Sequence, residues 1–470
     1  MSGTLLDTIA AVSTPRGKGG VALIRISGPA AGEICEKIFF PAGKTSPVSS
    51  PRTAVFGTVR YPENSPRANE KADDGICVFY KGPHSFTGED TAEICCHGGV
   101  LVTRDVLGAA FAAGARQAEA GEFTRRAFAA GKISLPEAES LGLLLDAGTD
   151  EQLKLSRSGL SGTLNAECES LRNEITFLLA DLYARIDFPE EDLGSLDENE
   201  FRDRLSALHG RAGRLAETYK TGRAVAAGID TVICGRTNVG KSSLYNLMTG
   251  AEDAIVTDVA GTTRDVLTAV VSFGGVTLRL SDTAGIRRSD ETVEKIGIER
   301  ARRRAETAEL KLFLIESDSV PDEEETGFAE TLLASSGVCV AVLTKSDAGE
   351  PTPEAAALAA KFPVCQKISS LTGEGIDGLA RTVSELFTDA SCDIRSDPVI
   401  STARQYEAVE RCLSSLSDAK SAAEAGFTSD VVSVCLEDAA RALSDLDGRG
   451  HGAVSADVIE RIFSVFCVGK

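Results

Sequence analysis

The sequence predicts a multidomain protein with an N-terminal α+β domain, an α-helical bundle, and a doubly wound α/β domain inserted into the bundle. Three observations lead to this fold class. Residues 1 to about 120 mix apolar strand-like runs with glycine-rich turns, as an α+β domain does. Two stretches, 136–222 and 402–466, carry apolar residues at helical spacing. Between them, residues 226–390 alternate strand-like and helical runs, which is typical of a mostly parallel sheet.

The N-terminal part can be divided into expected elements. Strands are expected at 21–26, 75–80 and 91–96, and a helix is expected within 97–114. Residues 41–74 are rich in proline, serine and charge, so we expect loops there.

The two helical stretches are expected to form one bundle. Neither stretch can bury its apolar stripe alone, so the simplest solution is that they pack together and that the segment between them forms a separate domain. We therefore expect an N-terminal domain at 1–130, two parts of a helical domain at 131–225 and 391–470, and an inserted domain at 226–390.

Length and composition narrow the class of protein. A chain of 470 residues exceeds one ordinary core, and 43% hydrophobic residues are typical of a globular protein. No apolar run is long enough to span a bilayer and the N-terminus lacks a signal-peptide pattern, so we expect a soluble, cytoplasmic protein with no membrane partner. The net charge of −21 argues against a mainly electrostatic nucleic-acid binder. The 12 cysteines include no C-x-x-C pair, which favours reduced, mostly buried thiols over a metal site.

One stretch of the inserted domain has the pattern of a phosphate-binding loop. Gly235-Arg236-Thr237-Asn238-Val239-Gly240-Lys241-Ser242 follows the apolar run 231–234 and precedes the helical run 243–248. Strand, glycine loop and helix are the context in which G-x-x-x-x-G-K-[ST] binds phosphate, because backbone N–H groups converge there on phosphate oxygens. Lys241 would reach the β- and γ-phosphates, and Ser242 would coordinate Mg²⁺.

Further motifs follow in the order that a guanine-nucleotide site requires. A switch loop with a Mg²⁺-binding threonine is expected at Gly261-Thr262-Thr263-Arg264-Asp265, and Asp282-Thr283-Ala284-Gly285 suits Mg²⁺ and the γ-phosphate. Thr344-Lys345-Ser346-Asp347 closes a predicted strand, and the Asp347 carboxylate can accept both N1–H and N2–H of guanine, a donor pair that adenine lacks. Ser369-Ser370-Leu371 can offer a backbone N–H to guanine O6.

The inserted domain resembles the TrmE–Era–EngA–YihA–Septin class of GTPases, and the resemblance extends along the chain. The segments that carry it are Asp7-Thr8-Ile9-Ala10, Arg16-Gly17-Lys18-Gly19-Gly20, Ser85-Phe86-Thr87-Gly88-Glu89-Asp90, His97-Gly98-Gly99, Gly121-Glu122-Phe123-Thr124-Arg125-Arg126-Ala127-Phe128 and Phe466-Cys467-Val468-Gly469-Lys470. Together they look like the TrmE/MnmE tRNA modification GTPases. Three positions depart from common GTPase patterns: Thr344 stands where the base-reading motif usually begins with Asn, Thr237 replaces the Pro often seen inside the phosphate loop, and Ile286 stands where many GTPases have a water-orienting Gln.

The resemblance implies a potassium-stimulated, GTP-hydrolysing subunit of a tRNA-modifying complex. Such a complex adds an aminomethyl or carboxymethylaminomethyl group to C5 of the wobble uridine, at tRNA position 34. The implied partners are tRNA, a second copy of the chain in a homodimer, and an MnmG/GidA-type flavoprotein that carries FAD, in a heterotetramer. The implied cofactors are K⁺, Mg²⁺ and 5,10-methylene-tetrahydrofolate, with 5-formyl-tetrahydrofolate as its analogue.

The resemblance also assigns residues to these ligands. Tetrahydrofolate contacts are implied for Arg25, Glu93, Lys132 and Lys470, potassium ligation for Asn238, Thr257, Val259 and Thr262, and Mg²⁺ ligation for Ser242 and Thr263. GTP contacts are implied for Asn238, Val239, Gly240, Lys241, Ser242, Ser243, Thr257, Asp258, Val259, Ala260, Gly261, Thr262, Thr263, Asp282, Thr283, Ala284, Gly285, Thr344, Lys345, Asp347, Ser369, Ser370 and Leu371.

Two residues and one alternative function complete the expectations. Ile286 can neither donate nor accept a hydrogen bond, and Glu294 matches the catalytic glutamate of the family, so we expect Glu294 to position the attacking water. Cys467 matches the terminal family cysteine; a nucleophilic role is open, and a buried structural thiol is favoured. The alternative function is a GTPase switch or assembly factor whose N-terminal domain only dimerises, and folate binding distinguishes the two.

Overall fold

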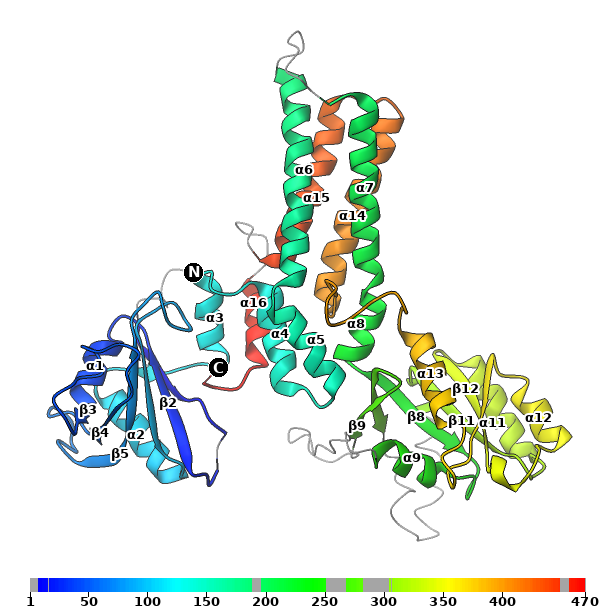
Figure 1. Ribbon diagram of the computed structural model, residues 1–470, viewed down its shortest axis with the longest axis horizontal. Coiled ribbons are helices and arrows are strands. Elements are labelled where there is room, and N and C mark those ends of the chain that lie inside the picture. The colour runs from blue at the N-terminus through cyan, green and yellow to red at the C-terminus, as the bar shows by residue number, and fades with distance from the viewer. Residues whose placement is uncertain are drawn as a thin grey trace. The chain divides into compact units, whose positions relative to one another are not determined.

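The computed structural model describes residues 7–15, 17–187, 196–250, 268–281, 304–305, 307–448 and 456–469 (Figure 1). The chain divides into two compact units, Met1–Gly142 with Asp447–Lys470 and Leu143–Leu446. None of the helices in the described ranges combines the length and the hydropathy that a bilayer crossing requires.

The first unit is built on a seven-stranded sheet in the order β3-β4-β5-β6-β2-β1-β7. Its strands are β1 (Ile9–Val12), β2 (Val21–Ser27), β3 (Phe39–Pro41), β4 (Val55–Arg60), β5 (Lys71–Tyr80), β6 (Thr91–His97) and β7 (Arg116–Gln117). Its helices are α1 (Ala31–Ile38), α2 (Val100–Ala112), α3 (Glu122–Ala129), α4 (Leu135–Asp146), whose last turn belongs to the second unit, and α16 (Ala456–Ser464). β1 pairs with β7 in parallel, and the other neighbouring strands are antiparallel.

The two faces of this sheet differ. On one face, Ile24 and Ile94 form a core with Ile34 of α1 and Val106 of α2. On the opposite face, Phe123 of α3 packs against β1. Alternation of side chains along each strand therefore assigns one set of residues to a closed core and the other set to a face that α3 covers at the β1 end.

Farther from β1, this second face carries exposed apolar side chains. Phe56 of β4 is 59% exposed and lies opposite Ile76 of β5, which is 43% exposed. Phe40 of β3 is 41% exposed and lies opposite Thr58, two residues along β4 from Phe56. We call Phe40, Phe56 and Ile76 the apolar stripe. A water-facing side of an antiparallel sheet usually presents polar residues, so this stripe is unusual.

The expectation of loops over 41–74 is wrong, because β4 lies within this range and β5 begins at Lys71. β1 was not expected either. In β4, buried Val55, Gly57 and Val59 alternate with more accessible residues, so no continuous apolar run marks the strand. The proline- and serine-rich flanks then dominate the local composition.

The second unit contains a helical bundle. Its helices are α5 (Asp150–Leu160), α6 (Thr163–Asp187), α7 (Glu198–Glu217), α8 (Tyr219–Ala226), α14 (Ala403–Glu424) and α15 (Ser429–Asp447). α6, α7, α14 and α15 lie side by side (Figure 1) and share one core, to which they contribute Leu171, Leu208, Leu416 and Leu436 respectively. The predicted joining of two distant helical stretches in one bundle is confirmed.

A six-stranded sheet in the order β13-β12-β11-β8-β10-β9 is inserted in the chain between α8 and α14. Its elements are β8 (Ile229–Gly235), α9 (Lys241–Thr249), β9 (Thr268–Phe273), β10 (Val276–Ser281), β11 (Leu310–Glu316), α11 (Glu323–Ala334), β12 (Val338–Thr344), the 3₁₀ turn η1 (Ser346–Ala348), α12 (Pro353–Ala359), β13 (Val364–Lys367) and α13 (Ile376–Phe387). Only edge strand β9 among these strands is antiparallel to its neighbour, to which the Gly274-Gly275 turn joins it. The predicted doubly wound fold class is therefore confirmed, whereas the bounds of the four predicted segments stay predictions.

Candidate nucleotide-binding site

The phosphate-binding loop joins β8 to α9 at the carboxyl end of the sheet. Gly235 has a φ of 142°, and a Cβ atom built there would lie 2.5 Å from the Leu314 carbonyl oxygen, so a side chain does not fit. Asn238 and Gly240 also have positive φ values of 64° and 104°. These conformations curl the chain back onto the N-terminus of α9, where first-turn N–H groups lack intrahelical acceptors and favour an anion.

The loop also carries an ammonium group and hydroxyl groups. Lys241 Nζ donates to the carbonyl oxygens of Gly235 (2.9 Å) and Arg236 (2.7 Å), so its ammonium group lies within the span of the loop. Ser242 and Ser243, in the first turn of α9, are exposed. The loop therefore combines backbone donors, a cation and accessible hydroxyls, which is the donor set of a phosphate and Mg²⁺ site.

The segment 344–347, which is predicted to read the base and is called the base-reading segment below, lies beside this loop. Thr344, the last residue of β12, is buried, and its hydroxyl donates to the Val239 carbonyl oxygen at 2.8 Å. Asp347 is exposed, and its Oδ1 accepts a 2.5 Å hydrogen bond from the Ser369 hydroxyl. Ser369 thus orients the carboxylate and leaves Oδ2 for a base. The threonine that replaces the usual Asn ties the base-reading segment to the phosphate loop through its own hydroxyl.

The rest of the base-reading segment surrounds Asp347. Lys345 adopts a left-handed conformation with a φ of 57°. The Ser370 hydroxyl oxygen is buried and has no hydrogen-bond partner among the described residues, and Leu371 is 84% exposed. Three of the predicted nucleotide segments, 235–243, 344–347 and 369–371, are therefore brought together at one edge of the sheet.

The remaining predicted residues lie outside the described ranges. They are Thr257, Asp258, Val259, Ala260, Gly261, Thr262, Thr263, Asp282, Thr283, Ala284, Gly285, Glu294 and Lys470. Their assignments to GTP, Mg²⁺, K⁺, catalysis and folate stay predictions.

In the first unit, Arg25 and Glu93 form an ion pair across β2 and β6. Both Nε and Nη2 of Arg25 lie 2.8 Å from Glu93 Oε1. The Arg25 guanidinium also lies against two aromatic rings, 5.2 Å from the centroid of Phe86 and 5.6 Å from that of Phe123. Arginine with aromatic walls and a neighbouring carboxylate can bind a planar polar ring or an anionic tail.

Lys132 lies near the same loop as Phe86. Its Nζ donates to the Pro83 carbonyl oxygen at 2.9 Å. At the C-terminal tail, the Ser13 hydroxyl donates to the Gly469 carbonyl oxygen at 2.9 Å, so the residue before Lys470 lies against the end of β1. Arg25 through Phe86 and Lys132 through Pro83 therefore both contact the loop between β5 and β6. Glu93 pairs with Arg25, and the tail contacts the chain just after β1.

A buried ionic network behind this loop was not found by the sequence reasoning. Arg126 donates to Glu122 (2.9 Å), Asp7 (2.7 Å) and Glu89 (3.1 Å). Burial alone would raise the pKa of Glu122, but hydrogen bonds from Arg116, the Glu119 N–H and Arg126 hold it at about 2. The spacing of Glu122 and Arg126, four residues apart on α3, was the signal that could have pointed to this pair.

The preference for a buried Cys467 is wrong, because this cysteine is exposed. Its position in the C-terminal tail, outside any helix, leaves its side chain in solvent. Seven of the other cysteines, 35, 77, 96, 168, 234, 339 and 412, are buried, and all twelve are free thiols, as expected. Among the described residues no cluster of His, Cys, Asp and Glu could hold a metal ion.

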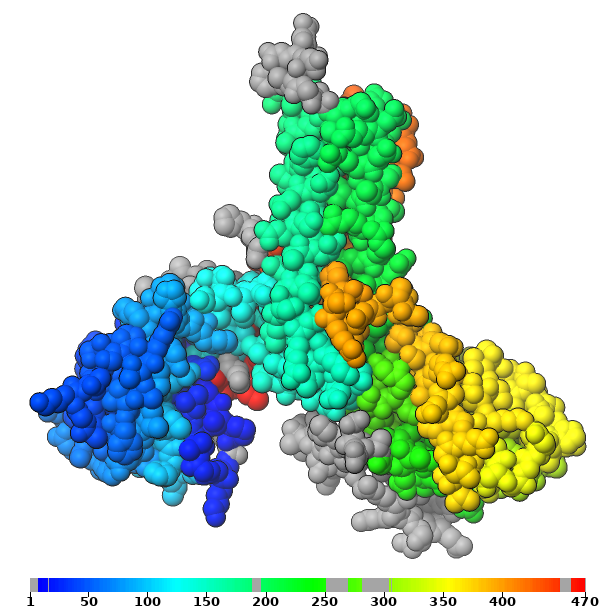
Figure 2. Space-filling view, in the orientation of Figure 1, coloured from blue at the N-terminus to red at the C-terminus, as the bar shows by residue number. Residues whose placement is uncertain are grey.

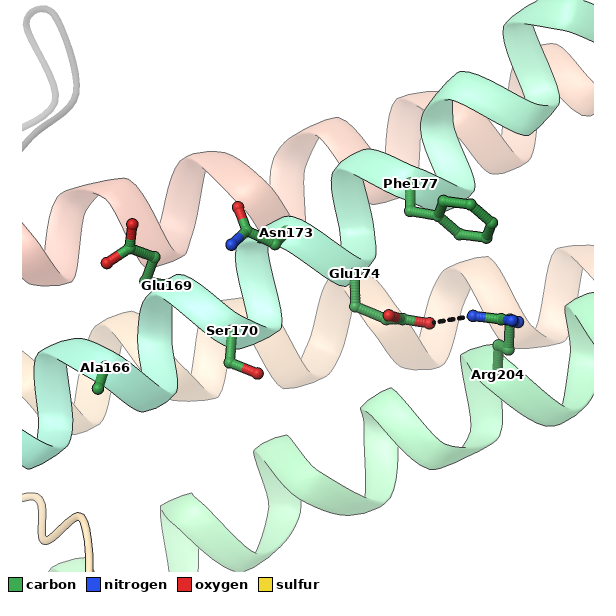
Figure 3. A pocket seen from close by; sticks show the side chains of 7 residues that line it. All are labelled: Ala166, Glu169, Ser170, Asn173, Glu174, Phe177 and Arg204. Carbon is green, nitrogen blue, oxygen red and sulfur yellow. Dashed lines mark hydrogen bonds and ion pairs between the residues drawn. The ribbon is translucent and has the colours of Figure 1, made fainter.

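A shallow hollow of about 560 Å³ on the bundle holds none of the predicted site residues. It lies on α6 and α7, which form part of the surface seen in Figure 2. Figure 3 shows that Glu174 of α6 faces Arg204 of α7, and their ion pair measures 2.9 Å. Arg204 also lies 4.9 Å from the Phe177 ring. These charges satisfy each other, so the hollow carries no separate assignment.

Comparisons with known proteins cover the whole chain. The family described as "MnmE helical domain" matches residues 135–467, and the family described as "GTP-binding protein TrmE N-terminus" matches residues 8–132. A tRNA modification GTPase MnmE from Natranaerobius thermophilus is 36% identical over 466 residues, 99% of each chain. This chain belongs to the MnmE family of tRNA modification GTPases. The MnmE proteins of Acetivibrio thermocellus, at 35% identity, and Clostridioides difficile, at 34%, also cover 99% of both chains.

The two solved structures described here cover about a third to two fifths of this chain, at low scores. The G domain of the T. maritima FeoB iron transporter is 24% identical and covers 33% of this chain and 97% of that chain, with a TM-score of 0.24. Aquifex aeolicus Era bound to GDP·AlF4⁻ is 21% identical and covers 40% of this chain and 66% of that chain, with a TM-score of 0.27. Scores this low carry no argument about function. Membership of the MnmE family rests on the full-length relatives, and it makes the chain a GTPase.

Proposed function

We propose that the chain is the GTP-hydrolysing subunit of a complex that adds an aminomethyl or carboxymethylaminomethyl group to C5 of the wobble uridine of tRNA. The observation that carries this proposal is similarity to MnmE proteins over 99% of the chain, including the N-terminal domain as well as the GTPase domain. A cytoplasmic location follows from a tRNA substrate.

The nucleotide part of the proposal is supported by the loops described above. Lys241 and the N-terminus of α9 would hold the phosphates, and Asp347, oriented by Ser369, would read guanine. The exposed hydroxyl of Ser242 fits Mg²⁺, a hard cation that prefers oxygen ligands, with Thr263 as the proposed second protein ligand. Mg²⁺ would neutralise phosphate charge.

A potassium site is proposed at Asn238, Thr257, Val259 and Thr262. Asn238 is exposed and has a left-handed backbone, so its amide oxygen is accessible at the mouth of the phosphate loop. K⁺ would supply positive charge there. The proposed water-positioning residue is Glu294, since Ile286 has no polar side-chain atom.

A tetrahydrofolate site is proposed at Arg25, Glu93, Lys132 and Lys470. Arg25 and Lys132 supply cations for the anionic tail, Glu93 supplies an acceptor for a pterin edge, and the exposed ring of Phe86 supplies a flat apolar wall. The residues thus fit the group, and methylene-tetrahydrofolate would donate the one-carbon unit. This fit favours the modifying subunit over the alternative, a GTPase switch or assembly factor whose N-terminal domain only dimerises.

The proposed partners are a second copy of the chain and an MnmG/GidA-type flavoprotein carrying FAD, in a heterotetramer that acts on tRNA. The apolar stripe supports a homodimer through the first unit, because exposed contiguous apolar side chains mark interaction surfaces.

The test is the nucleoside composition of tRNA from a strain that lacks this gene. We expect the modified wobble uridine to disappear, to return with the wild-type gene, and to stay absent with Glu294→Ala. A deletion strain with unchanged wobble uridines would refute the modifying function and leave the switch alternative. A full return of the modification with Glu294→Ala would contradict only the role of Glu294.

A further inference from the structure

Glu316 occupies a position between the two nucleotide-reading segments. It is the last residue of β11, the strand between β8 and β12. In the strand register, Leu314 lies beside Gly235 at the start of the phosphate loop, and Glu316 lies beside Thr344 at the start of the base-reading segment. Since parallel strands end at the same edge, the Glu316 side chain lies where both segments leave the sheet.

Each oxygen of the Glu316 carboxylate accepts from one of these segments. Oε2 accepts from Arg236 Nη2 of the phosphate loop at 3.0 Å, and Oε1 accepts from Lys345 Nζ of the base-reading segment. Arg236 Nη2 also lies 3.0 Å from the Ser319 hydroxyl. The Glu316 side chain is only 15% exposed, so these charges are partly removed from water and interact more strongly than a surface pair.

The backbone conformation of Lys345 explains why its contact with Glu316 matters. Lys345 is a non-glycine residue in the left-handed region, a conformation that persists only where surrounding contacts hold it. Arg236 follows Gly235, and the carbonyl oxygens of both residues accept from Lys241 Nζ. Fixing the side chains of Arg236 and Lys345 on one carboxylate therefore restrains the two segments that would hold phosphate and base.

The charges of Arg236, Lys345 and Glu316 also favour keeping these three side chains together. Without Glu316, the side chains of Arg236 and Lys345 would lose the carboxylate that both of them contact. The hydrogen bond from Lys345 lowers the pKa of Glu316, burial opposes this effect, and the charges of Lys345 and Arg236 add to the lowering. Glu316 therefore stays a carboxylate at neutral pH.

We propose that Glu316 is a positioning residue for guanine nucleotides, which holds the phosphate loop and the base-reading segment at a fixed separation through Arg236 and Lys345. The inference rests on the proposed function, because it assumes that these segments bind GTP and GDP. Glu316 touches neither nucleotide; it acts on the two segments that do. Since GTP and GDP share the base and the β-phosphate, both should lose affinity when the carboxylate is removed.

The experiment measures binding of fluorescent mant-GDP and mant-GTP to the full chain. Glu316→Gln keeps the shape and removes the charge, and we expect Kd for both nucleotides to rise about tenfold while KM rises and kcat at saturating GTP changes less than about twofold, the pattern of lost uniform binding. The matched control is Glu330→Gln, which removes the exposed Lys361–Glu330 ion pair of the same domain. A Kd for Glu316→Gln within twofold of wild type would overturn the proposal.

A double-mutant cycle separates positioning from a merely structural role. If Glu316 acts through Lys345, Glu316→Gln should raise Kd less in a Lys345→Gln background than in wild type. A second cycle combines Glu316→Gln with Arg236→Gln. Fully additive effects on Kd in both cycles would overturn the proposal. A Glu316→Gln chain with fewer binding sites but an unchanged Kd would also overturn it, because that result indicates partial unfolding. A wild-type chain that binds neither nucleotide would overturn the proposed function and this inference with it. If wild type binds the nucleotides and Glu316→Gln binds them with the same Kd, only the inference about Glu316 is overturned.

Discussion

At the scale of single residues, Glu122 shows how hydrogen bonds and ion pairs stabilise a buried carboxylate. Its side chain is 1% exposed, and it accepts from Arg116, from Arg126 and from the Glu119 N–H. A buried charge is costly unless it is paired and hydrogen-bonded, and here three donors meet that condition. Through Arg126 the same network reaches Glu89 at the loop that carries Phe86. The loop that carries Phe86 is therefore tied to this buried ionic network through Glu89.

This network predicts a pH-dependent stability. The pKa of Glu122 is lowered from its usual 4.5 to about 2 in the folded chain. The stabilisation is present in full above pH 4.5, where both states are ionised, and is lost as pH falls from 4.5 to 2, because the unfolded state takes up the proton first. A shift of this size corresponds to roughly 3 kcal/mol.

Urea denaturation followed by far-UV circular dichroism checks this prediction. Glu122→Gln should unfold more easily than wild type at pH 7, and the difference in unfolding free energy between the two should shrink between pH 4.5 and pH 2. Glu33→Gln, which removes a surface pair with Lys37, is the control and should change little. A difference that is the same at pH 7 and pH 3 would mean that the charge of Glu122 is not responsible.

At the scale of elements, Thr344 at the end of β12 connects the base-reading segment to the phosphate loop. The Thr344 hydroxyl is buried and donates to the Val239 carbonyl oxygen of the phosphate loop. Thr344→Val removes this donor without changing the shape and leaves a buried acceptor unpaired, which should cost about 1–3 kcal/mol. We expect weaker GDP binding by about threefold or more, because the phosphate loop loses its tie to β12.

Isothermal titration with GDP measures this effect. Thr344→Asn should retain most of the affinity, since an amide can donate to the same carbonyl. Thr331→Val is the matched control, because the exposed Thr331 hydroxyl donates within its own helix, to the Gly327 carbonyl oxygen. Equal GDP affinity of wild type and Thr344→Val would show that the hydroxyl does not matter for the loop.

Some strands of this protein could be predicted from the sequence, whereas other strands and the long-range ion pairs could not. Strands β8, β11 and β12 are buried on both faces and form continuous apolar runs, so they and the motifs at their ends were predicted. β4 is buried on one face and was predicted as loop. The Arg236–Glu316 and Asp7–Arg126 pairs join residues 80 and 119 positions apart, and no local pattern encodes such pairs. Cys467 was misassigned because composition says little about exposure in a terminal tail.

At the scale of the whole molecule, the apolar stripe on the first unit has to be explained. Phe40, Phe56 and Ile76 are neighbours on one sheet face and are 41–59% exposed. Beside them lie charged groups of both signs, including the Lys71–Asp74 pair and Arg60, whose guanidinium lies 6.0 Å from the Phe40 ring. An apolar centre with mixed charges around it is suited to a second copy of the same face.

This surface leads to a prediction about assembly. If two copies pair through the stripe, Phe56→Glu places two carboxylates in an apolar interface, where each would lose its hydration without a partner. The dimer dissociation constant should rise by about a hundredfold or more, the change that roughly 3 kcal/mol produces. Sedimentation velocity of the full chain at micromolar concentration should then give a dimer for wild type and a monomer for Phe56→Glu.

Val320→Glu, at an equally exposed valine on the second unit, is the control and should remain dimeric. Circular dichroism must show the same helix content in all three chains, because α1 and α2 cover the other face of the sheet and the substitution should leave their core intact. A wild-type monomer, or a Phe56→Glu chain that sediments as a dimer, would show that the stripe is not the dimer interface.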